Sequence, residues 1–255
     1  MLLAIDIGNS SVSLGVFNEE RELMFSSGFE ADWGKTRDQC AIEIRSIFRL
    51  YGAELRDVTG SVVSSVVPPV TPSIIGAVEM LTGCRSIVVG PGVKTGINIL
   101  TDVQAQLGTD IVCAAVGAVN RYPTPLVVVD MGTAITVTPV TKDKAIPGCA
   151  IMPGVRTGLE AMAEKTAQLP WIALEEPKSV IGKNTIESMR SGVVYGTAGM
   201  IDSLVERMEA EIGEATVVAT GGSSLPILKS CRREIVFNNH LVLLGLQDIY
   251  YKNLK

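Results

Sequence analysis

Two Asp-x-Gly segments hold the residues whose types and spacing are best suited to chemistry. One is AIDIGNSS, around Asp6, and the other is VVVDMGTAIT, around Asp130. In each, an apolar run typical of a β-strand ends in an aspartate, and the ligand clefts of α/β sheets open at such strand ends. The glycine two residues later lacks a Cβ and lets the backbone approach a ligand closely. The Asn, Ser or Thr that follows, with the N–H groups of the turn, can donate hydrogen bonds to an anion. Both segments therefore indicate phosphate loops.

The chemistry expected of these loops is that of a nucleotide and its cation. Asp6 is expected to hold a hydrated Mg²⁺ that bridges to phosphate oxygens, and Thr133 offers a hydroxyl donor. A third segment, VVATGGSS, has a strand followed by Gly221 and Gly222, which leaves bare backbone against which an adenine ring could lie. A single Asp-x-Gly turn between strands is common, but the three segments together predict a nucleotide site. The chain has neither a Walker lysine motif nor a GxGxxG after a strand, which argues against P-loop and dinucleotide folds.

The elements that must position these loops alternate between strand and helix. Apolar, strand-length runs cover 2–7, 12–17, 22–28, 126–130 and 216–220, and helical spacing covers 37–52, 71–82, 107–121, 154–166, 185–212 and 240–252. The alternation indicates an α/β fold. Since the strand–Asp-x-Gly–strand pattern occurs twice, we expect two similar halves, residues 1–118 and 119–255, facing each other across a cleft.

Composition limits the remaining classes of function. Of the 255 residues, 47% are hydrophobic and 19% charged, which favours a packed globular protein over a disordered one. A net charge of −5 argues against nucleic acid or an anionic membrane as the main partner. No apolar run is long enough to predict a spanning helix, and the apolar start lacks a basic leader. Scattered cysteines and a single histidine indicate reduced thiols in the cytoplasm and argue against structural zinc.

Several segments, in order along nearly the whole chain, resemble one family. They include IDIGNSSVSLGVF, GPGVKTG, LGTDI, VVVDMGTAITV, IGKNTIESMRSGVVYG and ATGGSS. The chain resembles type III pantothenate kinase, also called the Bvg accessory factor family, of the acetate and sugar kinase/Hsp70/actin superfamily. The resemblance implies two actin-like (ribonuclease H-like) halves with a nucleotide cleft between them. It implies ATP-dependent phosphorylation of pantothenate to 4'-phosphopantothenate, the first step of coenzyme A biosynthesis. It also implies Mg²⁺, a monovalent cation (K⁺ or NH4⁺), a homodimer and a cytoplasmic location.

The resemblance assigns roles to particular positions. Asp110, in LGTDI, would be the general base, and Asp130 would help to bind the monovalent cation. The residues expected to bind ATP are Asp6, Ile7, Gly8, Asn9, Ser10, Ser11, Val12, Ser13, Thr133, Gly221 and Gly222. The residues expected to bind the substrate are Thr101, Gly108, Thr109, Asp110, Ile111 and Thr185.

The role of Asp110 is chemically reasonable. Phosphoryl transfer depends mainly on in-line positioning and charge neutralisation, and a carboxylate beside the attacking hydroxyl can accept its proton. Without the resemblance, Asp110 is a helix N-terminal residue, where capping and the helix dipole favour aspartate. The two interpretations are compatible, because a carboxylate at a helix start can also face a ligand.

The chain departs from the family on the substrate side. The family motif Gly-Ala-Asp-Arg is Gly108-Thr109-Asp110-Ile111 here, so the arginine expected to grip the substrate carboxylate is absent. Thr101 stands where a tyrosine is usual, and Thr138 stands where the family often has an aspartate. Three hypotheses follow: a pantothenate kinase with rebuilt substrate contacts, a kinase for another small hydroxyl substrate, or a non-catalytic nucleotide-binding regulator.

Overall fold

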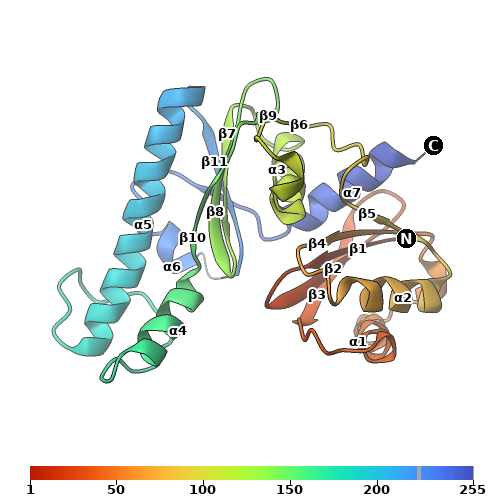
Figure 1. The fold of residues 1–255 in the computed structure, drawn as a ribbon, viewed down its shortest axis with the longest axis horizontal. Coiled ribbons are helices and arrows are strands. Elements are labelled where there is room, and N and C mark those ends of the chain that lie inside the picture. The colour runs from red at the N-terminus through yellow and green to blue at the C-terminus, as the bar shows by residue number, and fades with distance from the viewer. Residues whose placement is uncertain (223–224, 255) are drawn as a thin grey trace. The chain divides into compact units, whose positions relative to one another are not determined.

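A computed structural model describes residues 1–222 and 225–254, as an α/β chain in two compact units (Figure 1). Unit 1 comprises Met1–Ile97, Val103–Gly117 and Leu241–Lys255, and unit 2 comprises Asn98–Asp102 and Ala118–His240. The α/β class and the two similar parts expected from the sequence are confirmed. The units differ from the expected halves because the last helix returns to the first unit.

The sheet of unit 1 has the order β3-β2-β1-β4-β5. Its strands are β1 Leu2–Ile7, β2 Ser11–Phe17, β3 Leu23–Glu30, β4 Gly60–Ser65 and β5 Ser86–Val88. The expected strands 2–7 and 12–17 correspond to β1 and β2, which pair antiparallel, and β1 also pairs parallel with β4. The strand that carries the first Asp-x-Gly loop is therefore central and is held on both sides.

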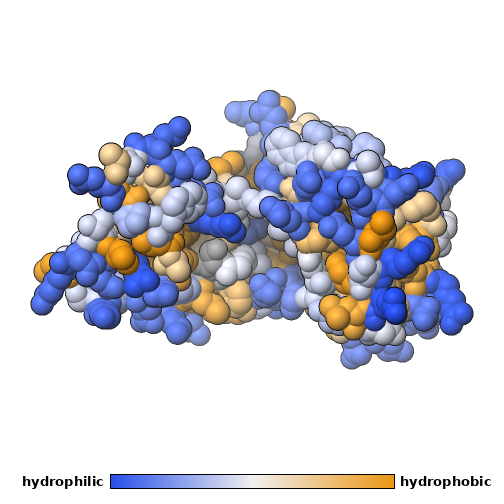
Figure 2. Space-filling model, turned by 90° about the horizontal axis from the view of Figure 1, so that it is seen from below, coloured by the Kyte–Doolittle hydropathy of each residue, from blue (hydrophilic) through white to orange (hydrophobic). Residues whose placement is uncertain are grey.

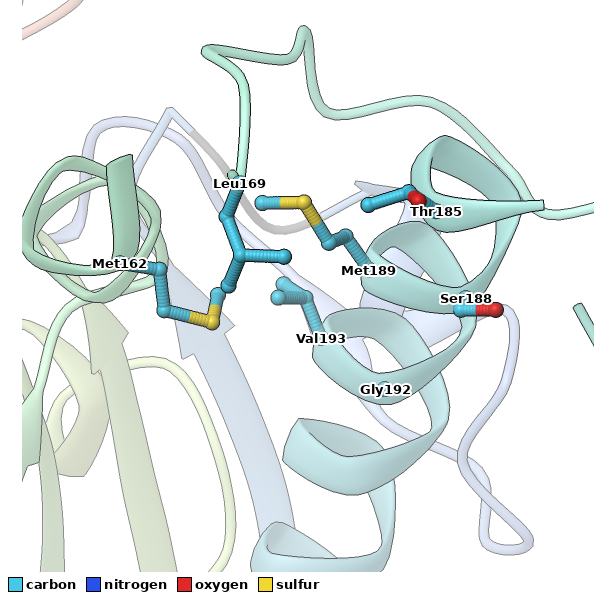
Figure 3. Close-up of a pocket in the computed structure, with 7 residues that line it drawn as sticks. All are labelled: Met162, Leu169, Thr185, Ser188, Met189, Gly192 and Val193. Carbon is cyan, nitrogen blue, oxygen red and sulfur yellow. The ribbon is translucent and has the colours of Figure 1, made fainter. Parts of the chain in front are cut away.

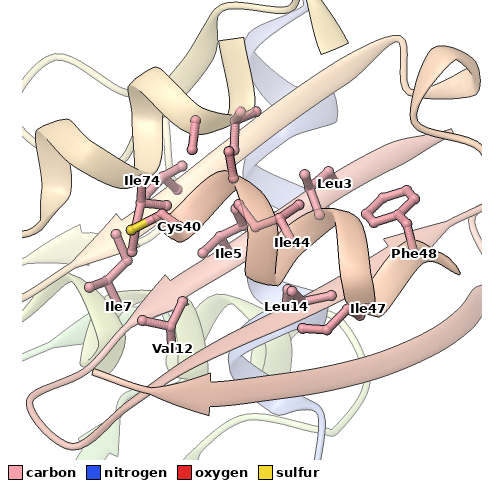
Figure 4. Packing of buried hydrophobic residues seen from close by; sticks show 14 of the residues in the cluster. Leu3, Ile5, Ile7, Val12, Leu14, Cys40, Ile44, Ile47, Phe48 and Ile74 are labelled. Atoms are coloured by element: carbon pink, nitrogen blue, oxygen red, sulfur yellow. The ribbon is translucent and has the colours of Figure 1, made fainter. Parts of the chain in front are cut away.

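One face of this sheet is covered by α1 (Arg37–Leu50) and α2 (Thr71–Thr82). A capping box at Thr36 and Gln39 starts α1, because each residue's side chain accepts a hydrogen bond from the other's backbone N–H. Side chains from alternate positions of β1 pack against Ile44, Phe48 and their neighbours (Figure 4). Burial of alternate positions leaves the opposite set of β1 side chains, which includes Asp6, on the other face of the sheet.

The other face of the unit 1 sheet carries α7 (Leu241–Asn253). A Cβ on Gly60 of β4 would lie 1.8 Å from the Tyr250 hydroxyl oxygen, so the helix rests directly on the strand. A Cβ on Gly245 would lie 1.8 Å from the carbonyl oxygen of Cys113 in α3 (Thr109–Val119). These glycines let α7 pack closely against β4 and α3, which explains why the C-terminal helix belongs to unit 1.

Unit 2 repeats the arrangement with a sheet of order β10-β8-β7-β11-β12. Its strands are β7 Leu126–Met131, β8 Ala134–Val140, β10 Ala150–Pro153, β11 Thr216–Thr220 and β12 Val236–Phe237. A separate ladder joins β6 (Asn98–Ile99) to β9 (Ala145–Ile146). As in unit 1, the Asp-x-Gly strand pairs antiparallel with the next strand and parallel with another.

The apolar face of this second sheet is covered by α4 (Val155–Lys165) and α5 (Thr185–Ile212). Asn184 caps α5 by accepting a hydrogen bond from the Glu187 N–H at 2.9 Å. The short helix α6 spans Leu225–Leu228, and single 3₁₀ turns η1 and η2 span Leu55–Asp57 and Gln104–Gln106. The expected helices 154–166 and 185–212 therefore agree with the structure to within a residue or so.

The two Asp-x-Gly strands occupy the same place in their sheets. Asp6 lies opposite Ser64 on the parallel neighbour β4, and Asp130 lies opposite Thr220 on the parallel neighbour β11. Both pairs belong to the face opposite the large apolar cluster of their own unit. The internal repeat in the sequence thus corresponds to the same strand pairing in both sheets. Each unit has an aspartate beside a hydroxyl side chain near the end of two parallel strands.

Within the described part of the chain, no helix has both the length and the apolar character needed to cross a bilayer. In the space-filling view, hydrophilic residues are interspersed with hydrophobic ones on the face shown (Figure 2).

Candidate active site

The first loop joins β1 to β2 through Gly8, Asn9 and Ser10. The Gly8 N–H donates to the Ser11 carbonyl oxygen at 2.9 Å and closes the turn. Asn9, Ser10 and Ser11 are exposed, so their polar groups can reach a ligand. A Cβ on Gly8 would lie 3.3 Å from the Ser11 carbonyl oxygen, so an alanine there would require the turn to shift slightly.

Two residues of the segment expected to bind ATP, Ile7 and Val12, point into the core instead of toward a ligand. Ile7 and Val12 are fully buried in the apolar core of unit 1, on either side of the loop. They pair with each other across β1 and β2. Their side chains anchor the loop, and only their backbone could contribute to ligand binding.

Asp110 is the second residue of α3, and its surroundings hold its carboxylate in place. Its Oδ1 accepts a hydrogen bond from the Ile111 N–H at 2.8 Å. A Cβ on Gly108 would lie 2.3 Å from the same Oδ1, so glycine leaves the space that the carboxylate occupies. Burial raises the pKa of Asp110 above its ordinary value, although the backbone hydrogen bonds oppose this shift.

Cys113 connects Asp110 to the first loop. It is fully buried one turn after Asp110, and burial is the main cause that raises its pKa well above the ordinary thiol value. The negative charges of Asp6 and Asp110 raise the pKa further, whereas a hydrogen bond with Ser64 lowers it. The structure therefore brings Asp6 and Asp110, both predicted site residues, around one protonated thiol within unit 1.

The second loop, Gly132 to Ala134, is held by the start of α4. The Thr133 carbonyl oxygen accepts hydrogen bonds from the Gly154 N–H at 3.0 Å and from the Thr157 Oγ1 at 2.9 Å. The loop itself closes when the Gly132 N–H donates to the Ala134 carbonyl oxygen at 3.1 Å. The Thr133 side chain remains exposed, as a ligand donor requires.

Gly221 and Gly222, expected to lie along an adenine ring, have different surroundings. Gly221 has a φ of +101°, and a Cβ there would lie 2.5 Å from the Met131 carbonyl oxygen. Glycine is therefore required at 221 for the chain to turn beside β7. Among the described residues, apart from its own chain neighbours, no heavy atom lies within 4 Å of the Cβ position of Gly222. Ser223 and Ser224, the end of the ATGGSS segment, lie outside the described residues.

The residues expected on the substrate side occupy three separate settings. Within the described residues, the buried Oγ1 of Thr101 has no hydrogen-bond partner. The Ile111 side chain is 7% exposed, so it packs in the interior. Thr185 is exposed at the first turn of α5.

Thr185 borders a pocket of about 590 Å³ within unit 2 (Figure 3). Three apolar side chains point toward one another across the pocket: Met162 of α4, Met189 of α5, and Leu169 from the segment between these helices. The Ser188 hydroxyl points away from them. That hydroxyl donates to the Gly182 carbonyl oxygen at 3.3 Å. The pocket is mainly apolar, and the Thr185 hydroxyl is the polar group at its edge.

The sequence did not single out Ser64, Ser65, Gly154 or Thr157. The two serines end a β-branched strand, SVVSS, which is the same signal that drew attention to the aspartates. Gly154 and Thr157 lie in PGVRT, at the start of a predicted helix. The sequence around these residues does not indicate their contacts, because the contacts join segments that are distant in the chain.

The possible cation ligands are hard oxygen atoms. Asp6 and Asp130 each end a strand with hydroxyl side chains beside them, and carboxylate and hydroxyl oxygens suit Mg²⁺ and alkali cations better than zinc. Among the described residues, no group of three or more His, Cys, Asp or Glu side chains is arranged to hold a metal ion. The donor set fits Mg²⁺ bound through one carboxylate together with substrate phosphates.

Comparisons with solved structures agree with this fold. An activator of 2-hydroxyisocaproyl-CoA dehydratase from Clostridium difficile, solved with bound ADPNP, matches 100% of this chain and 98% of its own, with a TM-score of 0.60 and 14% identity. Component A of (R)-2-hydroxyglutaryl-CoA dehydratase from Acidaminococcus fermentans matches 98% of this chain and 97% of its own, with a TM-score of 0.59 and 16% identity. At these identities the likeness concerns the fold alone.

Sequence comparisons reach the family. The family model described as type III pantothenate kinase matches residues 2–207. A type III pantothenate kinase from an Exiguobacterium species is 38% identical over 255 residues, which is 100% of both chains. One from Halalkalibacterium halodurans is 38% identical over 254 residues, or 99% of this chain and 100% of the relative. The resemblance read from the motifs is confirmed, and this chain, a kinase by its relationships, belongs to the type III pantothenate kinase family.

Proposed function

We propose that this chain phosphorylates pantothenate with ATP, with Asp110 as the general base. The observation that carries the proposal is Asp110 itself, a carboxylate fixed at the start of α3 within unit 1, in the same cluster as Asp6 of the first loop. The family match over most of the chain supports the reaction. Asp110 accepts the proton of the attacking hydroxyl as the bond to phosphorus forms.

The raised pKa of Asp110 suits this role. A general base works best when its pKa lies near the operating pH, and burial shifts this carboxyl upward from its ordinary value. The Ile111 N–H and the space left by Gly108 hold the carboxylate in one orientation. A base held in this way needs little reorganisation when the substrate hydroxyl arrives.

ATP binding is proposed for the two loops and Gly222. The exposed Asn9, Ser10 and Ser11 offer donors to phosphate oxygens, and Thr133 offers its hydroxyl from the second loop. Asp6 would hold hydrated Mg²⁺, and Asp130 would hold K⁺ or NH4⁺. Bound cations supply charge neutralisation to the transferred phosphoryl group.

The substrate side is proposed to use donors other than an arginine at position 111. Ile111 offers none, so pantothenate's carboxylate must meet groups elsewhere. Thr101, with its buried hydroxyl, and Thr185, at the edge of the apolar pocket, are the residues proposed to contact the substrate. A mainly apolar pocket with a hydroxyl at its rim suits a branched aliphatic hydroxy acid amide.

A homodimer in the cytoplasm is proposed for the assembled enzyme. Unit 2 has large apolar side chains that are strongly exposed: Trp171 is 64%, Val180 65% and Ile181 79% exposed. Exposed apolar side chains are candidates for a protein interface, and a second copy of the chain is the partner that we propose.

The deciding experiment measures ATP consumption with pantothenate and with a panel of small primary alcohols, each in K⁺ and in Na⁺. Turnover with pantothenate that requires K⁺ supports the proposal. Turnover only with another alcohol replaces the substrate, and no turnover with any acceptor, despite ATP binding in calorimetry, supports a nucleotide-binding regulator. The Asp110→Asn variant serves as the negative control for background ATP hydrolysis.

A further inference from the structure

The hydroxyl of Thr109, the first residue of α3, lies at the centre of a hydrogen-bond network. Its Oγ1 is 3.0 Å from the Ser64 Oγ, accepts from the Ser65 N–H at 3.2 Å, and donates to the Ser65 carbonyl oxygen at 3.1 Å. All three partners belong to the end of β4, 44 or 45 residues earlier in the chain. The start of the helix is thus tied to the end of the strand by one side chain.

The inventory of donors sets the direction of each bond. A hydroxyl has one hydrogen to donate and two lone pairs. Because Thr109 donates to the Ser65 carbonyl, it must accept from both the Ser65 N–H and the Ser64 hydroxyl. Every hydrogen-bonding position of the Thr109 hydroxyl is therefore used.

The network connects the two carboxylates of the site. Ser64 lies opposite Asp6 in the parallel register of β1 and β4, and Asp110 follows Thr109 directly. A shift of the Thr109 backbone would carry Asp110 with it. An alanine at position 109 has no hydroxyl and could form none of these bonds.

We infer that Thr109 is a positioning residue, whose hydroxyl fixes the start of α3 to β4 and so sets where Asp110 stands relative to the first phosphate loop. The inference rests on the proposed function for its link to catalysis, but the tie itself is a property of the fold. It assigns to Thr109 a role other than direct contact with the substrate.

The test compares Thr109→Val, which keeps the shape and removes the hydroxyl, with Thr109→Ser, which restores it. The matched control is Thr71→Ala, because Thr71 makes two side-chain hydrogen bonds at the same strand end, to Ser65 Oγ at 2.6 Å and to the Val67 carbonyl at 2.8 Å, but starts α2 instead of α3. Steady-state kcat and KM for ATP and pantothenate are measured for each variant. Hydrogen–deuterium exchange of the first turn of α3 is measured in parallel.

We expect Thr109→Val to lower kcat by about 10- to 100-fold, since a misplacement of about 1 Å can cost about 100-fold. KM for ATP should be unchanged, Thr109→Ser should recover most of the activity, and exchange at the start of α3 should rise in Thr109→Val alone. An unchanged kcat in Thr109→Val, or an equal loss in Thr71→Ala, would overturn the inference. If the wild-type chain does not phosphorylate pantothenate, the proposed function fails, and the exchange result still decides whether Thr109 holds the helix.

Discussion

Gly154 approaches Gly132 so closely that a Cβ at position 154 would lie 2.3 Å from the Gly132 carbonyl oxygen. The same Cβ would lie 2.3 Å from the Thr133 carbonyl oxygen, which accepts the Gly154 N–H. Both obstructing atoms are backbone atoms of the second Asp-x-Gly loop. The start of α4 and the loop are therefore in close contact within unit 2, and a side chain cannot be added between them without displacing the loop.

Gly154→Ala should therefore weaken ATP binding and lower the melting temperature, because the second loop must move. The matched control is Gly158→Ala, within α4, where no described atom outside the neighbouring helix backbone lies within 4 Å of the new Cβ. That control should be stabilised by about 0.5–1 kcal/mol, from the higher helix propensity of alanine. Calorimetry with ATP and thermal unfolding check both variants. Equal ATP affinity in Gly154→Ala and wild type would contradict a role for this loop in nucleotide binding.

Asp110→Asn should abolish phosphoryl transfer, leave ATP affinity nearly intact, and raise the melting temperature at neutral pH. The pKa of Asp110 is raised in the fold, so folding favours its protonated form. That stabilising contribution is complete below the ordinary aspartate pKa and is lost as the pH rises through the raised value. Asparagine keeps the neutral form at every pH and can still accept the Ile111 N–H.

The difference in melting temperature between Asp110→Asn and wild type should consequently shrink as the pH is lowered below the ordinary aspartate pKa. Thermal unfolding at several pH values, together with single-turnover kinetics, tests this prediction. The activity of the wild-type chain should fall on the acid side as Asp110 becomes protonated. Retained turnover in Asp110→Asn would remove this residue from the mechanism.

Ile111→Arg, which introduces the arginine that the resemblance led us to expect, should destabilise the chain. The isoleucine side chain is 7% exposed, so the longer arginine must overpack the interior or push its charge out to water. Overpacking alone costs about 1–3 kcal/mol. Ile111→Leu, which conserves volume, is the matched control and should cost less than about 1.5 kcal/mol. Denaturant unfolding measures the stability of both variants. An Ile111→Arg variant that is as stable as the wild type and has a lower KM for pantothenate would instead mean that the arginine contacts the substrate.

Glu209 of α5 should stabilise unit 2 above mildly acidic pH. Its hydrogen bond from Arg233, 2.9 Å long, is the main cause that lowers the pKa of Glu209, with a further bond from the Ala215 N–H. A lowered pKa gives a contribution that is present above the ordinary glutamate pKa and is lost as the pH falls through the lowered value. Glu209→Gln should cost about 1 kcal/mol at neutral pH, and the cost should vanish in acid. A pH-independent cost in unfolding experiments would contradict this assignment.

Ile181→Glu should turn the proposed dimer into a monomer, because it places a charge on the proposed interface surface at Ile181, which is 79% exposed. The matched control is Ile42→Glu on α1, where the isoleucine is 65% exposed in unit 1. Sedimentation velocity of both variants and of the wild type measures the mass. A wild-type monomer, or a dimer that survives Ile181→Glu, would show that this surface is not the interface.

Many of the strands and helices, and the family, could be predicted from the sequence alone. Both Asp-x-Gly strands were found because each is an apolar run of strand length that leads to an aspartate and because glycine permits the turn, and these are local properties. The helices that begin at Arg37 and Thr185 were found by their apolar spacing. The family followed from motif order, and the comparisons confirm it.

The sequence by itself thus determined the class of fold, the repeat of the two loops and the family. Only the tertiary structure decided which distant residues support them. Thr109 meets Ser64 across 45 residues, Gly154 closes on Gly132, α7 returns to the first unit, and Ile111 lies in the interior. These contacts depend on how separate elements pack, and packing is set by the whole chain at once, so no local pattern of residue types records it.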